Sequence, residues 1–457
     1  MKSVKIFFIL LLACAAFPLP FARGDSQDAA TAQISLDYSQ EKGKFSKYLF
    51  GAFNAPYYDE KGLQLIKDAN FKIVAIMDGD LEQKQARALE EGRLDGAIFY
   101  SHNRYLGKQE LEKNIQALLN KIDSLKKRYP GFEIKIFLFA NEPDLPEEQL
   151  FENYSVFARY LKMKNPEYIV GGLGFAAAFY PSGKERIKNF IEYADKNRAP
   201  LDFIAYHAYS YEIKEAFSGT YEYIQGLLES HPGISPLFGT AKIALTEMDI
   251  QEQPLPQEMP CPQMRTDWRA AHNILALSAL AEKGLWMSCE KGGPFQDFND
   301  EANFLWVNQD ATIQPVYYAH KAFNALAGTI RIGQEGSDFQ TFGALAGKSP
   351  NNDALYMVIS NYDEGAFRRA FSGETLPPPP PEFFQKSNDL KTYRNYSITV
   401  KKLPWSSSDI FLMERYAVDQ KHNLELIEIS EMIGSDQLTI ERDISLPQVQ
   451  LIKIHRK

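Results

Sequence analysis

The chain has 457 residues, of which 45% are hydrophobic and 24% charged, a balance that excludes a mostly disordered protein. This length allows one large domain with a smaller one beside it. The 50 basic and 59 acidic residues give a formal net charge of −9 without a basic stripe, so we do not expect nucleic acid as a partner.

Residues 1–24 have the pattern of a secretory signal peptide. Two lysines precede an apolar run from Ile6 to Ala16, which is too short to span a bilayer as a helix. The segment Leu11–Cys14 also resembles a bacterial lipobox, in which Cys14 would be acylated and attach the protein to a membrane. An ordinary apolar residue of the signal is the alternative for Cys14. We therefore expect an exported protein that is periplasmic, an outer-membrane lipoprotein or extracellular.

Eight short apolar segments alternate with amphipathic segments of helical periodicity between residues 45 and 328. The apolar segments are centred near Gly51, Val74, Ile98, Phe137, Val170, Ile204, Leu245 and Met287. Their centres lie roughly 25 to 40 residues apart, the span of a strand, a helix and two loops. The pattern predicts an α/β protein with a (β/α)8 TIM barrel over residues 45–328.

Three helices of this barrel have recognisable ends. After the fourth strand, Asp144 is the expected cap, with Pro146 in the first turn and Glu147 at the capping-box position. Residues 265–284 predict a helix that places Trp268, Ala271, Leu275 and Ala279 on one stripe and ends at Gly284. Residues 313–328 predict a last helix that closes the barrel.

Residues 329–457 change to strand-like alternation. The expected strands are residues 354–362, 396–402, 410–418, 424–429 and 449–454, which together predict a C-terminal antiparallel β-sandwich domain. We expect a strand around Ile34, within the N-terminal segment 25–44, to join this domain. The five prolines from Pro377 to Pro381 predict an exposed loop, because proline does not fit a central strand.

Polar residues follow several of the predicted barrel strands at the carboxyl end, where TIM-barrel enzymes carry their active sites. These residues are Asn141, Glu142 and Pro143 after the fourth strand, His207 and Tyr209 on the sixth, Glu247 and Asp249 on the seventh, and Glu290 and Lys291 on the eighth. Two glutamates at one mouth suit retaining glycoside hydrolysis, which needs an acid/base and a nucleophile about 5 to 5.5 Å apart. We expect Glu142 to be poorly solvated, because its strand is apolar.

The spacing of His, Cys and Asp predicts no metal site, and no glycine-rich phosphate loop follows a strand, so we expect no cofactor. Cys261 and Cys289 are expected on neighbouring parts of the barrel rim. A disulfide between them is a hypothesis, and two free thiols are the alternative.

The order of the segments NEPD, YHAYS, LTEMD and PVYYAHKAFNALAG resembles the clan A glycoside hydrolases. Within that clan the chain is most similar to glycoside hydrolase family 39, the β-xylosidases and α-L-iduronidases. Residues 414–423, ERYAVDQKHN, resemble a segment of the β-domain of that family. Two departures are visible: the second strand lacks the arginine of many clan A enzymes, and Trp286 comes early on the eighth strand.

The resemblance implies a role for each candidate residue. Glu142 would be the acid/base and Glu247 the nucleophile of a retaining O-glycosidase. Asn141 would hydrogen-bond the 2-hydroxyl of the sugar, while His207 and Tyr209 would orient the nucleophile and line the subsite. Lys291 would grip a sugar carboxylate, or would form only a surface pair with Glu290. The implied partner is a carbohydrate, and no protein partner is predicted.

Two function classes remain open from the sequence. One is a secreted or envelope-attached glycosidase, which would act either on a terminal xylose or uronic acid or within an exopolysaccharide chain. The other is a catalytically silent barrel that binds polysaccharide or scaffolds an envelope complex, because short motifs do not by themselves establish activity.

Overall fold

The computed structural model describes residues 30–53, 60–100, 105–176, 178–210, 212–249, 263–291, 313–363 and 391–457. The expected signal peptide, the lipobox with Cys14, the residue Cys261 and the proline run 377–381 all lie outside these residues. Among the helices that this part of the chain forms, none is long and apolar enough to cross a membrane.

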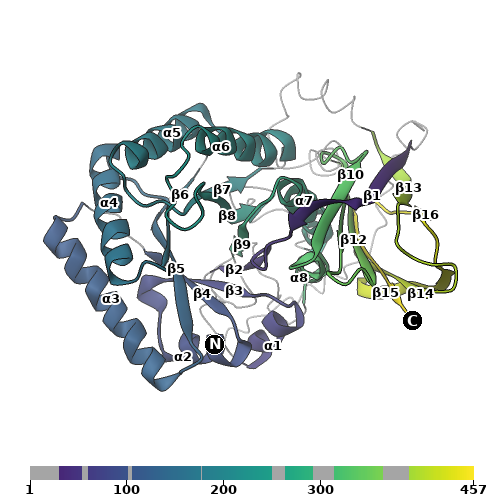
Figure 1. The fold of residues 1–457 in the computed structure, drawn as a ribbon, viewed down its shortest axis with the longest axis horizontal. Helices are drawn as coiled ribbons and strands as arrows, with labels where there is room; N and C mark the ends of the chain where they lie inside the picture. Colours follow the sequence, from purple (N-terminus) through teal and green to yellow (C-terminus); the bar gives the residue numbers. More distant parts are fainter. Residues whose placement is uncertain are drawn as a thin grey trace, which may run out of the picture.

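Eight strands close into a parallel barrel, which confirms the predicted TIM-barrel class (Figure 1). In order around the barrel they are β2 (Gly51–Phe53), β3 (Ile73–Met77), β4 (Asp95–Tyr100), β5 (Glu133–Asn141), β6 (Ile169–Phe175), β7 (Phe203–Tyr209), β8 (Lys242–Asp249) and β9 (Met287–Lys291). All eight apolar segments expected to be barrel strands are strands of this barrel. β9 pairs with β2 to complete the ring.

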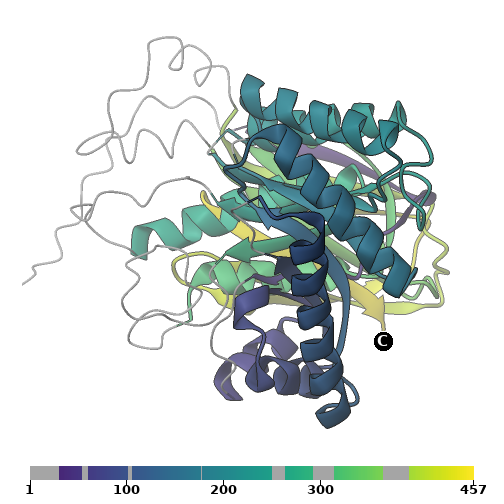
Figure 2. The same ribbon diagram turned by 90° about the vertical axis from the view of Figure 1, so that its left-hand side faces the viewer.

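Helices follow the barrel strands in the chain. They are α1 (Glu60–Asp68), η1 (Asp78–Asp80), α2 (Gln83–Gly92), α3 (Lys108–Arg128), α4 (Glu147–Lys164), α5 (Pro181–Lys196), η2 (Ile213–Gly219), α6 (Thr220–Glu229), α7 (Gln263–Glu282), α8 (Pro315–Phe323) and η3 (Asn324–Leu326). Helices α3 to α6 cover the side of the barrel that faces away from the second domain (Figures 1 and 2). The barrel is therefore shielded by helices on one flank and by the second domain on the other.

The interior of the barrel is a packed core. Its buried side chains come from alternate positions of the strands and include Ile73, Ala75, Ala97, Phe99, Ile136, Leu138, Phe203, Ala205, Ala244, Met287 and Cys289. Filling of this kind is typical of eight-stranded barrels, whose active sites lie above the filled layers. It leaves the carboxyl ends of the strands as the surface on which polar groups can meet.

The second domain is one nine-stranded sheet in the order β15-β14-β17-β12-β11-β10-β1-β13-β16. Its strands are β1 (Ala30–Lys44), β10 (Ile330–Glu335), β11 (Phe342–Lys348), β12 (Ala354–Asn361), β13 (Tyr393–Lys401), β14 (Ile410–Val418), β15 (Asn423–Ile433), β16 (Gln437–Asp443) and β17 (Gln448–Arg456). β1 pairs antiparallel with β10 and parallel with β13. A separate mainly antiparallel sheet is thus present, with one parallel pair that we did not expect.

This single sheet curls around a hydrophobic core of its own. The predicted β-sandwich of two sheets is therefore one curled sheet. Met357 of β12, Tyr396 of β13, Phe411 of β14 and Ile452 of β17 all belong to that core and are buried. The two ends of the sheet meet in an ion-pair network. Glu428 on β15 accepts hydrogen bonds from Arg442 Nε on β16 (2.8 and 3.0 Å) and from Arg415 Nε on β14 (2.9 Å).

Helix α7 joins the two domains, and Figure 1 shows it between the barrel and the sheet. It packs against β11, β12 and β17 as well as β8. Side chains from Asp267 to Ala281 are buried on every face of the helix. The predicted single apolar stripe is therefore too narrow, because the sheet covers the face that would otherwise meet water. The chain leaves the helix at Gly284, whose φ is +98°.

The expected cap of α4 is wrong. The helix begins at Glu147, its N-cap residue is Pro146, and no side chain caps it by a hydrogen bond. Asp144 lies two residues before the cap position, too early to accept from the free N–H groups of the first turn.

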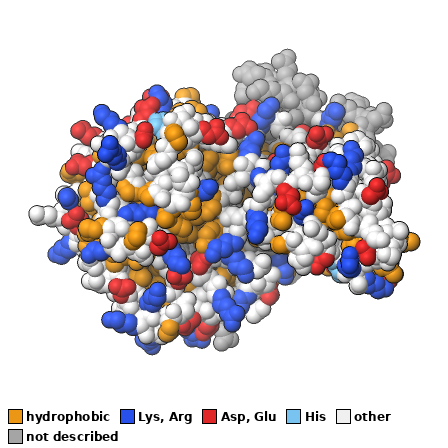
Figure 3. All heavy atoms as spheres, in the orientation of Figure 1, with side chains coloured by type: hydrophobic (Ala, Val, Ile, Leu, Met, Phe, Trp, Pro, Cys, Tyr) orange, Lys and Arg blue, Asp and Glu red, His pale blue; other side chains and the backbone are white. Residues whose placement is uncertain are grey.

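On the face drawn in Figure 3, acidic and basic side chains are interspersed.

Candidate active site

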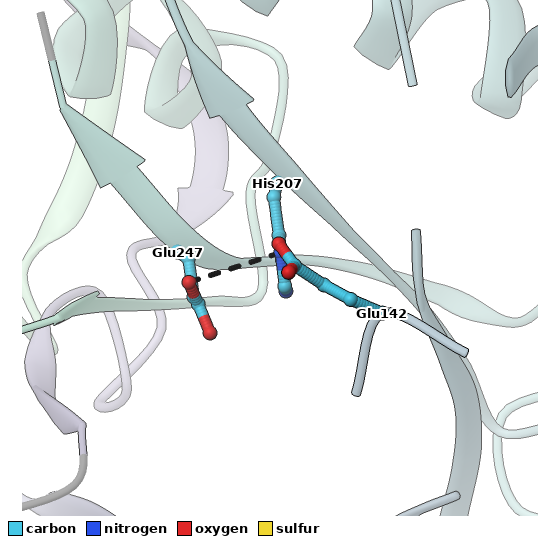
Figure 4. Close-up of side chains that lie close together, drawn as sticks. All are labelled: Glu142, His207 and Glu247. Carbon is cyan, nitrogen blue, oxygen red and sulfur yellow. Dashed lines mark hydrogen bonds and ion pairs between the residues drawn. The ribbon is translucent and has the colours of Figure 1, made fainter. Parts of the chain in front are cut away.

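Five polar side chains meet at the carboxyl ends of three barrel strands, the position that the sequence predicted for them. Asn141 ends β5 and Glu142 follows it, His207 and Tyr209 lie on β7, and Glu247 lies on β8. Strands β7 and β8 are neighbours, with His207 opposite Glu247 in the register. Figure 4 shows Glu142, His207 and Glu247 converging on one space.

Glu247 is the buried carboxylate of the site, with its side chain 2% exposed. Its Oε1 accepts a hydrogen bond from Asn141 Nδ2 at 3.0 Å, and its Oε2 accepts one from Tyr209 Oη at 2.6 Å. A buried charge is tolerated only when hydrogen bonds replace water. These two donors come from different strands and bind one oxygen each, so Glu247 is held in one orientation.

Glu142 has a different environment. Its side chain is 44% exposed, and its Oε1 lies 2.7 Å from Nδ1 of the fully buried His207. The expectation of poor solvation is therefore wrong. The apolar residues of β5 stay below, in the core, while the chain turns outward at Glu142, where φ is +47°. That left-handed conformation costs on the order of 1 kcal/mol for a residue with a Cβ, and the Glu142 N–H donates to the Gly174 carbonyl at 2.8 Å across to β6.

The two carboxylates face each other at short range. One donor or acceptor atom from each of Glu142, His207 and Glu247 lies within 4.8 Å of the other two. Such a trio could also surround a metal ion, and the 2.7 Å contact between His207 and Glu142 has the length of a hydrogen bond. The structure therefore brings the two carboxylates and the imidazole together at the carboxyl end of the barrel.

His207 and Tyr209, which the sequence assigned to the same role, contact different carboxylates. Tyr209 contacts the nucleophile candidate Glu247 at 2.6 Å. His207 contacts Glu142 at 2.7 Å and lies 3.9 Å from Glu247 Oε2. The shorter contact of His207 is thus with the acid/base candidate Glu142. Its position near both carboxylates results from the pairing of β7 with β8.

Gly174 on β6 is a site residue that we did not identify from the sequence. A Cβ at this position would lie 2.8 Å from Asn141 Oδ1 and 3.1 Å from His207 Nε2. Both atoms are buried and have no hydrogen-bond partner among the described residues. The segment EYIVGGLG contained the signal, since glycine in a strand often marks a close approach.

Several other candidates lie at the margin of the site or outside it. Lys291 and Glu290 end β9 and Asp249 ends β8, but their side chains lie outside the described part of the structure, so a grip on a sugar carboxylate stays a prediction. Trp286 precedes β9 at the opposite end of the barrel, where its ring packs 5.9 Å from that of Tyr48 and 5.2 Å from that of Phe203.

Cys289 does not lie on the rim. Among the described residues it is a free cysteine, fully buried in the barrel interior. Its proposed partner Cys261 lies outside the described residues, so the disulfide stays a hypothesis. Burial raises the pKa of the Cys289 thiol, and the nearby Glu247 carboxylate adds to this rise. The thiol therefore stays neutral and acts as an apolar filler below the site.

Comparison with known proteins supports the resemblance seen in the sequence. The chain matches no protein-family model. A curated β-xylosidase of Geobacillus stearothermophilus is 27% identical over 180 residues, which is 37% of this chain and 34% of that protein. The match thus spans about a third of the curated relative.

Solved structures match over nearly the whole chain. A glucosidase from Croceicoccus marinus has a TM-score of 0.73 at 17% identity, covering 94% of this chain and 99% of its own. A family 39 glycoside hydrolase (GH39) enzyme from Xanthomonas axonopodis pv. citri has a TM-score of 0.61 at 14% identity, covering 95% and 99%. The resemblance to clan A glycoside hydrolases of the family 39 type is confirmed. In this chain the two glutamates lie at the carboxyl ends of β5 and β8, the fourth and seventh strands of the barrel.

Proposed function

We propose that this protein is a retaining glycoside hydrolase with Glu142 as acid/base and Glu247 as nucleophile. The observation that carries the proposal is a pair of glutamates in unlike environments, with one carboxylate oxygen of each within 4.8 Å of the other. Glu247 is buried and receives two hydrogen bonds, as a carboxylate that must attack while ionised requires. Glu142 is open to solvent and linked to His207, as a group that exchanges protons with a leaving group and with water requires.

The reaction would proceed in two displacements. In the first, a Glu247 oxygen bonds to the anomeric carbon while the glycosidic C–O bond breaks and Glu142 gives its proton to the departing oxygen. In the second, Glu142 takes a proton from a water molecule, whose oxygen replaces Glu247 on the anomeric carbon. Asn141, which contacts Glu247 Oε1, would donate to the 2-hydroxyl of the bound sugar.

The proposed substrate is an O-linked glycan with a terminal xylose or uronic acid. The names of the relatives, a β-xylosidase and a glucosidase, support a glycosidic substrate but differ in the sugar. Cleavage within an exopolysaccharide is the second candidate. Turnover of a panel of nitrophenyl glycosides and envelope polysaccharides would decide between the two modes, since a chain-end enzyme releases only monosaccharide.

A matched pair of variants tests the function itself. Glu247→Ala should lower kcat by roughly three orders of magnitude or more, because the nucleophile is lost. Glu133→Ala, at the other end of the strand that leads to Glu142, should keep wild-type turnover. Wild-type protein that binds glycans but cleaves none of the panel would favour the catalytically silent barrel.

We also propose that the protein is exported, on the pattern of residues 1–24. If Cys14 is acylated, Cys14→Ser should move the protein from the membrane fraction to the soluble fraction. Unchanged fractionation, with a mature chain that begins after Ala22, would reject membrane attachment through Cys14.

A further inference from the structure

Gly174 lies next to Asn141 and His207, two side chains that contact the candidate carboxylates. It lies on β6, between the strand that carries Asn141 and the strand that carries His207. Its carbonyl accepts from the Glu142 N–H at 2.8 Å. Its Cα faces Asn141 Oδ1 and His207 Nε2, which would lie 2.8 and 3.1 Å from a Cβ.

These contacts connect to both catalytic candidates. Asn141 donates to Glu247 Oε1 at 3.0 Å, and His207 lies 2.7 Å from Glu142 Oε1. A side chain at Gly174 would press on Asn141 and His207 together, so it would disturb the nucleophile and the acid/base at the same time. The polar atoms that it would meet are buried, and His207 is only 1% exposed, so they have little room to withdraw.

We infer that Gly174 is a positioning residue whose missing side chain sets the relative placement of Glu142 and Glu247. The inference rests on the proposed glycosidase function and deepens it. The φ of Gly174 lies outside the left-handed region that favours glycine, so the backbone itself would accept alanine. Glycine is needed here because of the space it leaves, and a single methyl group is a sufficient test.

Gly172, on the same strand, provides the matched control. A Cβ there would meet the Tyr154 ring at 3.1 Å and the Phe139 carbonyl at 3.3 Å, which are packing groups away from the carboxylates. Gly172→Ala therefore imposes a similar steric load on β6 without touching Asn141 or His207. Any effect common to both variants belongs to the strand and not to the site.

The kinetic test compares the two variants on nitrophenyl glycosides and on a substrate with a poor leaving group. Gly174→Ala should lower kcat at least 30-fold with KM changed less than threefold, and should shift the alkaline limb of the kcat/KM profile, because moving His207 would alter its 2.7 Å contact with the acid/base Glu142. Gly172→Ala should leave the pH profile in place. Equal kcat losses in both variants with unshifted profiles would overturn the inference.

A second readout does not depend on turnover and so separates this inference from the proposed function. In 15N-histidine NMR, Gly174→Ala should move the His207 ring resonances, assigned by their loss in His207→Gln, while Gly172→Ala should not. Moved resonances in a protein that cleaves no glycan would uphold the positioning role and reject the function. Unmoved resonances in Gly174→Ala would reject the positioning role whatever the activity.

Discussion

Asn141 and Glu247 come from strands three places apart in the barrel, and Asn141 Nδ2 donates to Glu247 Oε1 across the mouth at 3.0 Å. This bond connects the residue beside the acid/base candidate to the nucleophile candidate. Tyr209 supplies the second donor from β7. Both carboxylate oxygens of Glu247 are therefore held by hydrogen bonds in the absence of substrate, and the effect of altering each surrounding residue can be predicted separately.

Glu142→Ala should separate the two chemical steps. A nitrophenolate leaves with little protonation, so the first step should keep a rate close to that of wild type on nitrophenyl substrates and fall steeply on alkyl or sugar leaving groups. Added azide should intercept the glycosyl-enzyme and give a glycosyl azide of retained configuration. In Glu247→Ala, azide would instead attack the sugar directly and give the inverted product. Product NMR distinguishes these outcomes, and equal losses on good and poor leaving groups would exclude Glu142 as the acid.

Tyr209→Phe removes the 2.6 Å hydrogen bond to Glu247 Oε2 and keeps the aromatic ring. A hydrogen bond to a buried charged group contributes about 1.5 to 3 kcal/mol, so kcat should fall roughly 10- to 100-fold. Tyr206→Phe on the same strand is the control, since its hydroxyl donates to the Phe217 carbonyl at 3.4 Å. If steady-state kinetics show the same turnover for both variants, Tyr209 does not support the nucleophile.

Asp267, on the helix between the domains, predicts a pH-dependent stability. Burial raises the pKa of this carboxyl from 3.8 to about 6, and the Asp419 carboxylate adds to the rise. The unfolded chain loses the Asp267 proton near pH 4, whereas the folded protein keeps it until about pH 6. The contribution of Asp267 to the free energy of unfolding is therefore highest below pH 4, and it falls as the pH rises through about 6. Asp267→Asn, which cannot ionise, should gain up to about 3 kcal/mol over wild type between pH 4 and 7 in urea unfolding.

The exposed Asp68 on α1 offers a control for this experiment. Asp68→Asn should follow the wild-type stability at each pH more closely than Asp267→Asn does. A stability difference between Asp267→Asn and wild type that is the same at pH 4 and pH 7 would contradict the role of burial.

The sequence was enough to predict the barrel and its two glutamates. Buried parallel strands are continuous apolar runs, and the polar residues that end those runs must lie at one mouth, so Glu142 and Glu247 were placed from one-dimensional information. The strand around Ile34 also has the alternation of a half-buried strand, and the structure describes it as β1.

Contacts between distant segments were not predictable in the same way. The segment FGALAGK of β11 is buried but made of small residues with weak strand preference, so it gave no signal. The burial of α7 on all sides depends on a sheet formed far along the chain. The exposure of Glu142 depends on its backbone conformation, with φ at +47°. The role of Gly174 depends on the side chains of other strands that lie where its Cβ would be.

The configuration of the first-formed product tests the central claim most directly. Wild-type enzyme is mixed with a cleaved aryl glycoside in an NMR tube, and the anomeric signals are recorded before mutarotation equilibrates them. One carboxylate oxygen of Glu142 lies within 4.8 Å of one of Glu247, and two carboxylates at such short range predict a double displacement. The anomer with the configuration of the substrate should therefore appear first. If the opposite anomer appears first, a water molecule attacks directly, and Glu247 is not the nucleophile.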